Sequence, residues 1–162
     1  MKEVMKNLFV GDIEDCKNVF NAVDANYAIV HACKTCHRLG VGYTGNLKND
    51  HPEYLIKEDG IDLFLNMVDM DRELMALYTN PIMKAAFEFI DKYLKLEHKV
   101  LVHCDQGGSR GPSVAMLYIS RYNQWPSYKY AVDYFKEIYP DFNPGRGIEL
   151  YMQKNFDAIM KL

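Results

Sequence analysis

Residues Lys99–Ser113 read KVLVHCDQGGSRGPS, and the architecture expected for the whole chain follows from them. Val100–Val102 is a short apolar run, too short for a helix and typical of a buried parallel strand. The glycines after Cys104 allow a tight loop whose backbone N–H groups turn inward, and apolar residues at helical spacing resume from Pro112. This order predicts a strand, a glycine-rich loop and the N-terminus of a helix in direct succession.

A loop of this kind is an anion site, because amide donors converge in it and the helix dipole favours negative charge. Phosphate is the expected ligand. The same field, together with the charge of Arg110, favours the thiolate form of Cys104, which is then a nucleophile. The planar guanidinium can bind two phosphoryl oxygens while the sulfur attacks phosphorus. The alternative is an inert buried thiol beneath a glycine turn. We therefore assign catalysis to Cys104 and Arg110, and substrate binding to Asp105, Gln106, Gly107, Gly108, Ser109 and Arg110.

The octapeptide His103–Arg110, HCDQGGSR, matches the signature H-C-x-x-G-x-x-R, and here the chain resembles the Cys-dependent protein phosphatase superfamily. Ser109 before the Arg, and Pro112-Ser113 after it, resemble the dual-specificity branch. The resemblance implies an α/β fold with a mainly parallel central sheet of about four to five strands flanked by helices. It also implies metal-independent phosphomonoester hydrolysis through a cysteinyl-phosphate intermediate, without a cofactor, in which His103 orients the loop and supports the thiolate.

Position 111 departs from the family pattern, which usually has Ser or Thr where this chain has Gly111. In the family this hydroxyl helps to stabilise the departing thiolate when the phosphoenzyme breaks down. We hypothesise that Ser109 or Ser113 substitutes for it. The alternative is a phosphoprotein-binding module with little catalysis, which Gly111 alone favours.

A general acid is expected after the apolar run Ile61–Val68, which predicts a third buried strand. The carboxyl ends of parallel strands share one edge of a sheet, so an acid there would lie beside the anion site and protonate the leaving oxygen. The resemblance implies the same place for the family's acid. Asp69 follows the strand directly and is preferred; Asp71 is the alternative, and either carboxylate can instead be simply solvated.

The substrate class is suggested by the charge of the loop, which contains no Lys and one Asp. Relatives act on phosphoinositides or RNA 5′ phosphates, which carry more charge and favour additional basic residues. We therefore expect a singly phosphorylated protein residue, phosphotyrosine or also phosphoserine and phosphothreonine, with the other two substrates as alternatives.

Composition limits the remaining possibilities. The 162 residues fit one domain, 1–162, and the formal net charge of −3 argues against general binding of nucleic acid or anionic membranes. Charges interrupt every apolar run near the N-terminus, and no stretch approaches a membrane span. With four Cys and no secretory signal, we expect a reduced, cytoplasmic monomer that acts on a phosphorylated protein.

The first third of the chain predicts a strand at Asn7–Val10, a helix at Ile13–Val23 with Cys16 in the core, and a strand at Tyr27–Val30. The segment His31–His37, HACKTCH, has spacing found in c-type haem attachment, in half of a zinc site and in redox dithiols. No export signal is present, and four ligands would be crowded. An ordinary loop is therefore expected.

A further hypothesis follows from the same topology. Cys33 lies just past one strand end and Cys104 at another, so Cys33 or Cys36 would form a reversible disulfide with Cys104 under oxidation.

The stretch Arg38–Asp59 has no periodicity and predicts a long loop that shapes the substrate entrance. Arg38, Tyr43 and Tyr54 are candidate substrate contacts, the alternative being a surface loop with aromatic anchors. Helices are predicted at Pro81–Leu96, Pro112–Tyr122, Ser127–Tyr139 and Gly145–Met160.

Overall fold

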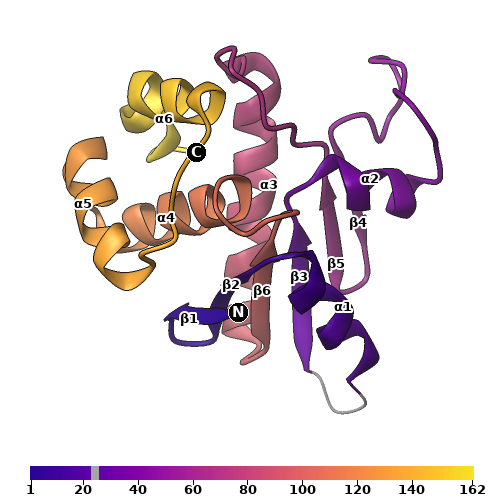
Figure 1. Cartoon of the computed structure of the whole chain (residues 1–162), viewed down its shortest axis with the longest axis horizontal. Helices are drawn as coiled ribbons and strands as arrows, with labels where there is room; N and C mark the ends of the chain where they lie inside the picture. Colours follow the sequence, from indigo (N-terminus) through magenta and orange to yellow (C-terminus); the bar gives the residue numbers. More distant parts are fainter. Residues whose placement is uncertain (23–25) are drawn as a thin grey trace.

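A computed structural model describes residues 1–22 and 26–162, in which six strands form one sheet in the order β1-β2-β6-β3-β5-β4 (Figure 1). The strands are β1 (Lys2–Met5), β2 (Leu8–Gly11), β3 (Tyr27–His31), β4 (Ile56–Asp59), β5 (Asp62–Leu65) and β6 (Lys99–His103). The four central strands β2, β6, β3 and β5 are parallel, whereas β1 and β4 pair antiparallel at the two edges. The carboxyl ends of the central strands therefore share one edge of the sheet, as the sequence predicts.

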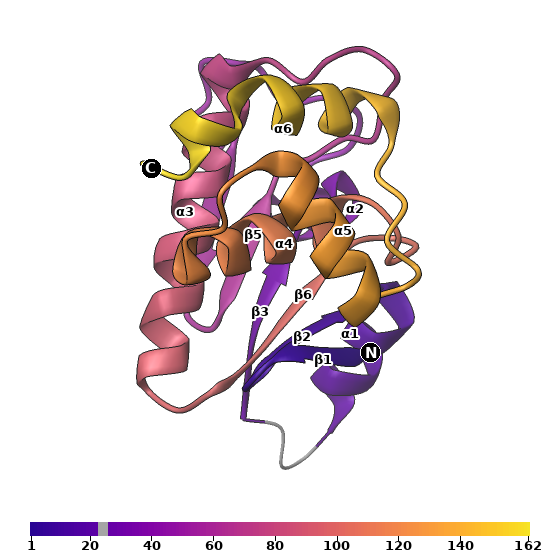
Figure 2. The same ribbon diagram turned by 90° about the vertical axis from the view of Figure 1, so that its left-hand side faces the viewer.

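Helices cover both faces of this sheet. They are α1 (Ile13–Asn21), α2 (Lys34–Val41), α3 (Ala76–Lys95), α4 (Arg110–Asn123), α5 (Tyr128–Ile138) and α6 (Arg146–Ile159). Figure 2 looks onto α4, α5 and α6, with the sheet behind them. The α/β class with a mainly parallel sheet is confirmed, and the two short antiparallel edge strands are the additions to the expected four to five. In the part of the chain that is described, no helix is long and apolar enough to cross the hydrocarbon layer of a membrane.

The alternation of side chains along β6 separates two cores. Val100 and Val102 belong to the large core beneath α3–α6, and both are fully buried. Leu101 points to the opposite face, where it packs with Cys16 of α1 and with Ile29 of β3. Because successive side chains of a strand face opposite ways, His103 continues the face of Leu101. Cys16 is 6% exposed, which confirms its predicted place in the core.

The sequence prediction is wrong about the region after β3. The segment expected as a loop at His31–His37 contains the last residue of β3 and the start of α2, which begins at Lys34 with Cys33 as its N-cap. The expected long loop Arg38–Asp59 contains the end of α2 and all of β4. The cause is tertiary: α2 packs on β4 and β5, and Gly40 lies so close to the Phe64 ring that a Cβ there would overlap it.

Other boundaries differ in smaller ways. α1 is described as far as Asn21, and the predicted end at Val23 lies outside the described residues. The third parallel strand ends at Leu65, three residues earlier than predicted. α3 begins at Ala76, five residues before Pro81, because an apolar face that includes Ile82 and Met83 packs into the large core in spite of the lost N–H donor of proline. The helices at the C-terminal end are confirmed to within two residues of their predicted ends.

Candidate active site

The nucleophile candidate lies where the sequence places it. β6 ends at His103, Cys104 follows with 2% of its surface exposed, and α4 begins at Arg110. Within the loop, Gly107 has a φ of +74°, and a Cβ there would lie 3.2 Å from the carbonyl oxygen of Gly11. Glycine is needed at this position because an L side chain rarely adopts that backbone conformation. The predicted succession of strand, loop and helix is confirmed.

Neighbouring segments hold the carbonyl groups of this loop from outside. The Tyr139 hydroxyl donates to the carbonyl of Gly107 at 2.8 Å, and the Asn143 N–H donates to that of Gly108 at 2.8 Å. The Ile13 N–H, at the start of α1, donates to the carbonyl of Asp105 at 3.3 Å. With its carbonyls engaged there, the loop is held rigidly at the N-terminus of α4, a position that favours anions.

Arg110 is fixed by two contacts. Its Nη2 donates to Oδ2 of Asp105 at 2.9 Å and its Nη1 to the carbonyl of Met67 at 3.1 Å. The Arg110 side chain is 11% exposed, and its Nε is buried without an acceptor among the described residues. Three of the five N–H groups of the guanidinium, including that of Nε, thus remain for an oxyanion. The Asp105 side chain, which belongs to the loop expected to bind substrate, pairs with Arg110 in this structure.

The structure distinguishes the two acid candidates. The Ser109 hydroxyl donates to Oδ1 of Asp69 at 3.4 Å and accepts from the N–H of Gly145 at 2.8 Å. A side chain at Gly145 would overlap Asp69. Asp71 is exposed and has no hydrogen-bond partner in the described parts of the chain. Asp69 is therefore the carboxylate that the structure brings to the loop.

The segment after Asp69 is tied to the start of α6. The N–H of Gly147 donates to the carbonyl of Met70 at 2.8 Å, and the N–H of Leu74 donates to the carbonyl of Gly147 at 3.1 Å. A Cβ at Gly147 would overlap the carbonyls of Met70 and Arg72. Sequence reasoning missed this function of the Gly145-Arg146-Gly147 turn; two glycines flanking a predicted helix start were the available signal.

Gly111 lies against the end of β6. A Cβ at this position would be 3.0 Å from the carbonyl carbon of His103 and 3.1 Å from the nitrogen of Cys104. Of the two hydroxyls proposed to replace the missing one, that of Ser109 is engaged with Asp69. Ser113 is fully buried, and its Oγ has no partner among the residues described.

The cysteines behind the loop are close together. Cys33, Cys36 and Cys104 form one buried cluster, and all are free thiols. The hydrogen bond with Cys36, followed by burial, raises the pKa of the Cys33 thiol well above its ordinary value. This cluster brings together the three cysteines named in the disulfide hypothesis.

The potential zinc ligands of the sequence segment are dispersed. His37 faces away from Cys33 and Cys36, with contacts from its Nδ1 to the Tyr43 hydroxyl at 2.7 Å and from its Nε2 to the Glu53 carbonyl at 2.9 Å. Two sets of three possible metal ligands share His103, one with Cys16 and His31 and one with Cys33 and Cys36. Neither set reaches the four ligands of a structural zinc site within the described chain.

Of the three candidate substrate contacts, Arg38, Tyr43 and Tyr54, only Tyr54 lies at a cavity in the described part of the chain. Arg38 donates to the Gly45 carbonyl through Nε at 2.9 Å and Nη2 at 2.7 Å, and Tyr43 contacts His37, so both stabilise their own segment. Tyr54 lines a cavity of about 390 Å³ beside the Asp69 segment.

Comparison with known proteins agrees with this geometry. Residues 25–153 match the family model of the dual specificity phosphatase catalytic domain. Tyrosine-protein phosphatase vhp-1 of Caenorhabditis elegans is 34% identical over 91 residues, which are 54% of this chain and 13% of that protein. Protein-tyrosine-phosphatase IBR5 of Arabidopsis thaliana is 32% identical over 92 residues, 51% of this chain and 36% of that protein. The matches thus span well under two thirds of either relative.

The fold agrees as well. The crystal structure of human DUSP28 has a TM-score of 0.65 at 18% identity, covering 97% of this chain and 93% of that one. Because the family model spans most of the residues that build the sheet and the loop, the chain belongs to the dual specificity phosphatase family of Cys-dependent protein phosphatases.

Proposed function

We propose that the protein hydrolyses phosphotyrosine, and also phosphoserine or phosphothreonine, in a phosphorylated protein, without a metal or cofactor. One observation carries the proposal: Cys104 ends β6 at the N-terminus of α4, beside an Arg110 whose Nε is buried and unpaired in the described structure. A thiol, a helix N-terminus and a guanidinium at one point match the nucleophile and the oxyanion site of phosphoryl transfer.

The proposed reaction has two steps. The Cys104 thiolate attacks phosphorus, the S–P bond forms, the O–P bond breaks, and Asp69 gives its proton to the leaving oxygen. The Asp69 carboxylate then takes a proton from water, which attacks phosphorus and releases phosphate and the thiolate. Arg110 and the loop amides hold the phosphoryl oxygens throughout. The contact between Ser109 and Asp69 supports the choice of acid, because it holds the carboxyl group at the edge of the loop.

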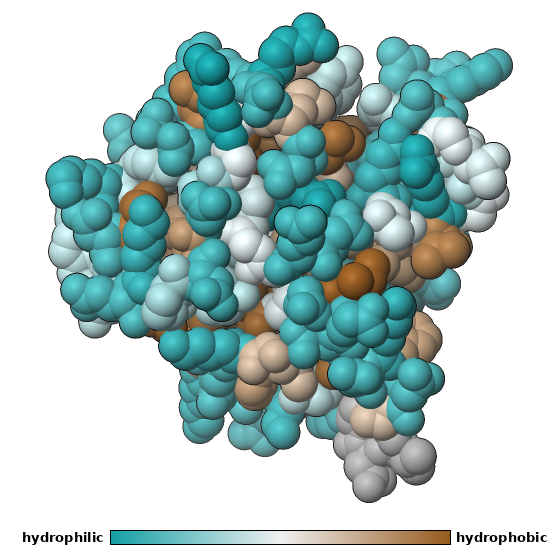
Figure 3. Space-filling model, in the orientation of Figure 1, coloured by the Kyte–Doolittle hydropathy of each residue, from teal (hydrophilic) through white to brown (hydrophobic). Residues whose placement is uncertain are grey.

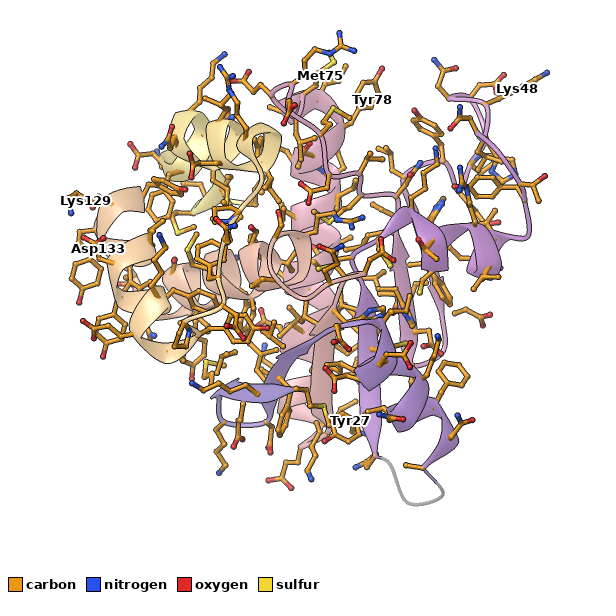
Figure 4. All side chains as sticks on the ribbon, in the orientation of Figure 1. Tyr27, Lys48, Met75, Tyr78, Lys129 and Asp133 are labelled. Carbon is orange, nitrogen blue, oxygen red and sulfur yellow. The ribbon has the colours of Figure 1, made fainter. Side chains whose placement is uncertain are left out.

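The surroundings of the loop support a protein substrate. The cavity of about 390 Å³ lies between the segment after α2 and the segment that leads into α3. Its lining is mainly apolar and includes Leu47, Leu55, Val68, Met70, Leu74, Met75 and Tyr78; its charged residues are Lys34, Arg72 and Glu73. Figure 4 shows Met75 and Tyr78 projecting at the N-terminal end of α3. On the face of the molecule seen in the same orientation, the hydrophobic areas are small and separate (Figure 3). A mainly apolar cavity is better suited to the side chains that flank a phosphorylated residue than to a polyanionic headgroup.

The proposal includes the setting of the reaction. We place the protein in the reducing cytoplasm as a monomer, with a phosphorylated protein as its partner. The four free cysteines are compatible with that setting.

The test is a phosphatase assay with chelator present, on a phosphotyrosine peptide, a phosphoinositide and a triphosphorylated RNA. We expect the peptide to be hydrolysed fastest, Cys104→Ser to abolish turnover, and Asp69→Asn to lower kcat by roughly a hundredfold or more. Asp71→Asn is the matched control and should change kcat by less than about twofold, as for a surface substitution. Turnover by Cys104→Ser would overturn the proposal, and so would loss of wild-type turnover when chelator is added.

A phosphoprotein-binding module with little catalysis is the second candidate. Gly111 favours it: this residue packs against His103 and Cys104 and has no hydroxyl there to assist breakdown of the phosphoenzyme. Stopped-flow phosphate release separates the two: binding without repeated release would identify the module.

A further inference from the structure

A chain of buried polar side chains leads to the backbone of the nucleophile from behind. Oδ1 of Asp62 is 2.8 Å from Nε2 of His31, whose Nδ1 is 2.7 Å from Nε2 of His103. Nδ1 of His103 is 3.2 Å from the carbonyl oxygen of Cys104. The three side chains come from the neighbouring strands β5, β3 and β6, and the register that pairs His31 with His103 brings the two rings together.

The number of protons follows from these contacts. The Asp62 carboxylate and the Cys104 carbonyl can only accept, so Nε2 of His31 and Nδ1 of His103 must each carry a hydrogen. The contact between the rings needs one hydrogen more. Two neutral imidazoles carry only two such hydrogens, so a fully bonded chain holds one additional proton. The Asp62 carboxylate supplies the opposite charge, as burial of an ion requires.

The other groups around the rings do not change this count. Cys16 of α1 places its Sγ 3.7 Å from Nδ1 of His31, and Cys36 of α2 places its Sγ 3.9 Å from Nε2 of His103. Phe64 of β5 stacks on the His31 ring at a centroid distance of 4.5 Å. The thiols are weak partners at longer range, and Asp12 and Asp105 act on His103 only through their charge.

The pKa directions agree with this proton count and indicate which ring is charged. Burial alone would lower the pKa of His31, but the hydrogen bond with Asp62 and the contact with Cys36 raise it above its ordinary value. Burial, followed by repulsion from His31, lowers the pKa of His103 to about 4. The additional proton therefore belongs to His31, and His103 stays neutral.

We propose that His31 and Asp62 are positioning residues: a charged His31, balanced by Asp62, holds His103 in the tautomer whose Nδ1–H donates to the Cys104 carbonyl. The first peptide group of the phosphate loop is thereby fixed. Loss of the additional proton breaks one contact in the chain and loosens the loop.

The kinetic test replaces His31 in two ways. In His31→Asn the amide nitrogen takes the place of the ring Nδ1 and still donates to His103, whereas His31→Leu keeps apolar bulk and has no donor. We expect Leu to lower kcat/KM by roughly tenfold, as loss of one hydrogen bond does, and Asn to restore it to within about threefold of the original. A purely packing role predicts the opposite order, with Leu better than Asn beside Phe64, and would overturn the proposal.

The spectroscopic test reads the protons without turnover. Imidazole ¹⁵N NMR of the wild type, at a pH below the transition of the pair, should show three ring N–H groups on His31 and His103, with His103 protonated at Nδ1 only. Asp62→Asn keeps an acceptor and removes the charge, so the pair should lose its third proton about one pH unit lower. The matched control is Asp59→Asn, an exposed carboxylate paired with Asp62 in the sheet register, and it should leave that transition in place.

The inference would be overturned if both rings were neutral over the whole pH range of the titration. It would also be overturned if Asp62→Asn and Asp59→Asn shifted the transition equally. The kinetic arm rests on the proposed phosphatase function, whereas the NMR arm does not. If the protein is inactive but His31 and His103 carry three ring N–H groups, the proposed phosphatase function alone is contradicted. If it is active but the two rings carry only two N–H groups, the inference alone is contradicted.

Discussion

Substitution of Gly111 tests how the chain compensates for the missing hydroxyl. A Cβ at this position would lie 3.0, 3.1 and 3.2 Å from three backbone atoms of His103 and Cys104. Carbon contacts are favourable only at about 3.5 Å or more, so α4 or the end of β6 has to move by a few tenths of an ångström. Overpacking of this kind costs roughly 1–3 kcal/mol. Removal of a helical glycine returns up to about 1 kcal/mol.

We therefore expect Gly111→Ala to lower the free energy of unfolding by roughly 1 kcal/mol. For a chain of this length, the corresponding loss in Tm is about 2–4 °C. Gly111→Ser should cost the same, because its Cβ meets the same atoms, but it adds a hydroxyl beside Cys104. Stabilisation of a charged leaving thiolate by a hydrogen bond should speed breakdown of the phosphoenzyme roughly tenfold or more relative to Gly111→Ala.

The assays are thermal unfolding of the three proteins and single-turnover stopped-flow kinetics that resolve formation and hydrolysis of the phosphoenzyme. The Ala variant is the matched control, since it has the steric change without the hydroxyl. An unchanged Tm in Gly111→Ala would refute the steric reasoning. Equal hydrolysis rates in the Ser and Ala variants would show that a hydroxyl has no use at this position.

Three further outcomes are expected. Asp105→Asn removes the carboxylate partner of Arg110, so inhibition by inorganic phosphate should strengthen by about two- to fivefold, the effect of a partly exposed ion pair, while Asp133→Asn on α5 (Figure 4) should leave it unchanged. Peroxide should oxidise the Cys104 thiolate to a sulfenic acid; the thiol of Cys33 or Cys36 then attacks the Cys104 sulfur, so that the S–S bond forms, the S–O bond breaks and water leaves. Peptide mapping without reductant detects the disulfide, and over-oxidised Cys104 alone would contradict it. Because the pKa of His103 is lowered to about 4 from its ordinary 6.5, the unfolded chain binds a proton between these values that the folded one does not. The contribution of His103 to stability is then complete above pH 6.5 and is lost as the pH decreases towards 4. Urea unfolding over that pH range, of the wild type beside His103→Asn, should show the smaller pH dependence in the variant.

The phosphate loop shows how far local sequence carries a prediction. Val100–Val102, the glycines after Cys104 and the helical spacing after Pro112 each report local conformation, and together they place the strand, the loop and the helix. The preference for Asp69 over Asp71 also began as a sequence argument, from the end of the preceding strand. α2 shows the limit of the approach. Its segment was predicted as a loop, and in the structure it is a helix that packs against β4 and β5.

Periodicity, glycine placement and the spacing of Cys104 and Arg110 belong to the order of residues along the chain, and they were sufficient for the phosphate loop and the nucleophile. The resemblance of His103–Arg110 to the phosphatase signature added the fold class. These local patterns could not predict which residues contact the site residues in the folded protein. Asp105 on Arg110, Gly145 beside Asp69 and the chain from Asp62 through His31 to His103 join segments that are far apart in sequence or whose contact depends on side-chain direction. Such contacts exist only after the sheet has set its register and the helices have packed, because hydrogen bonds act over about 3 Å and local sequence carries no record of what will be brought that near.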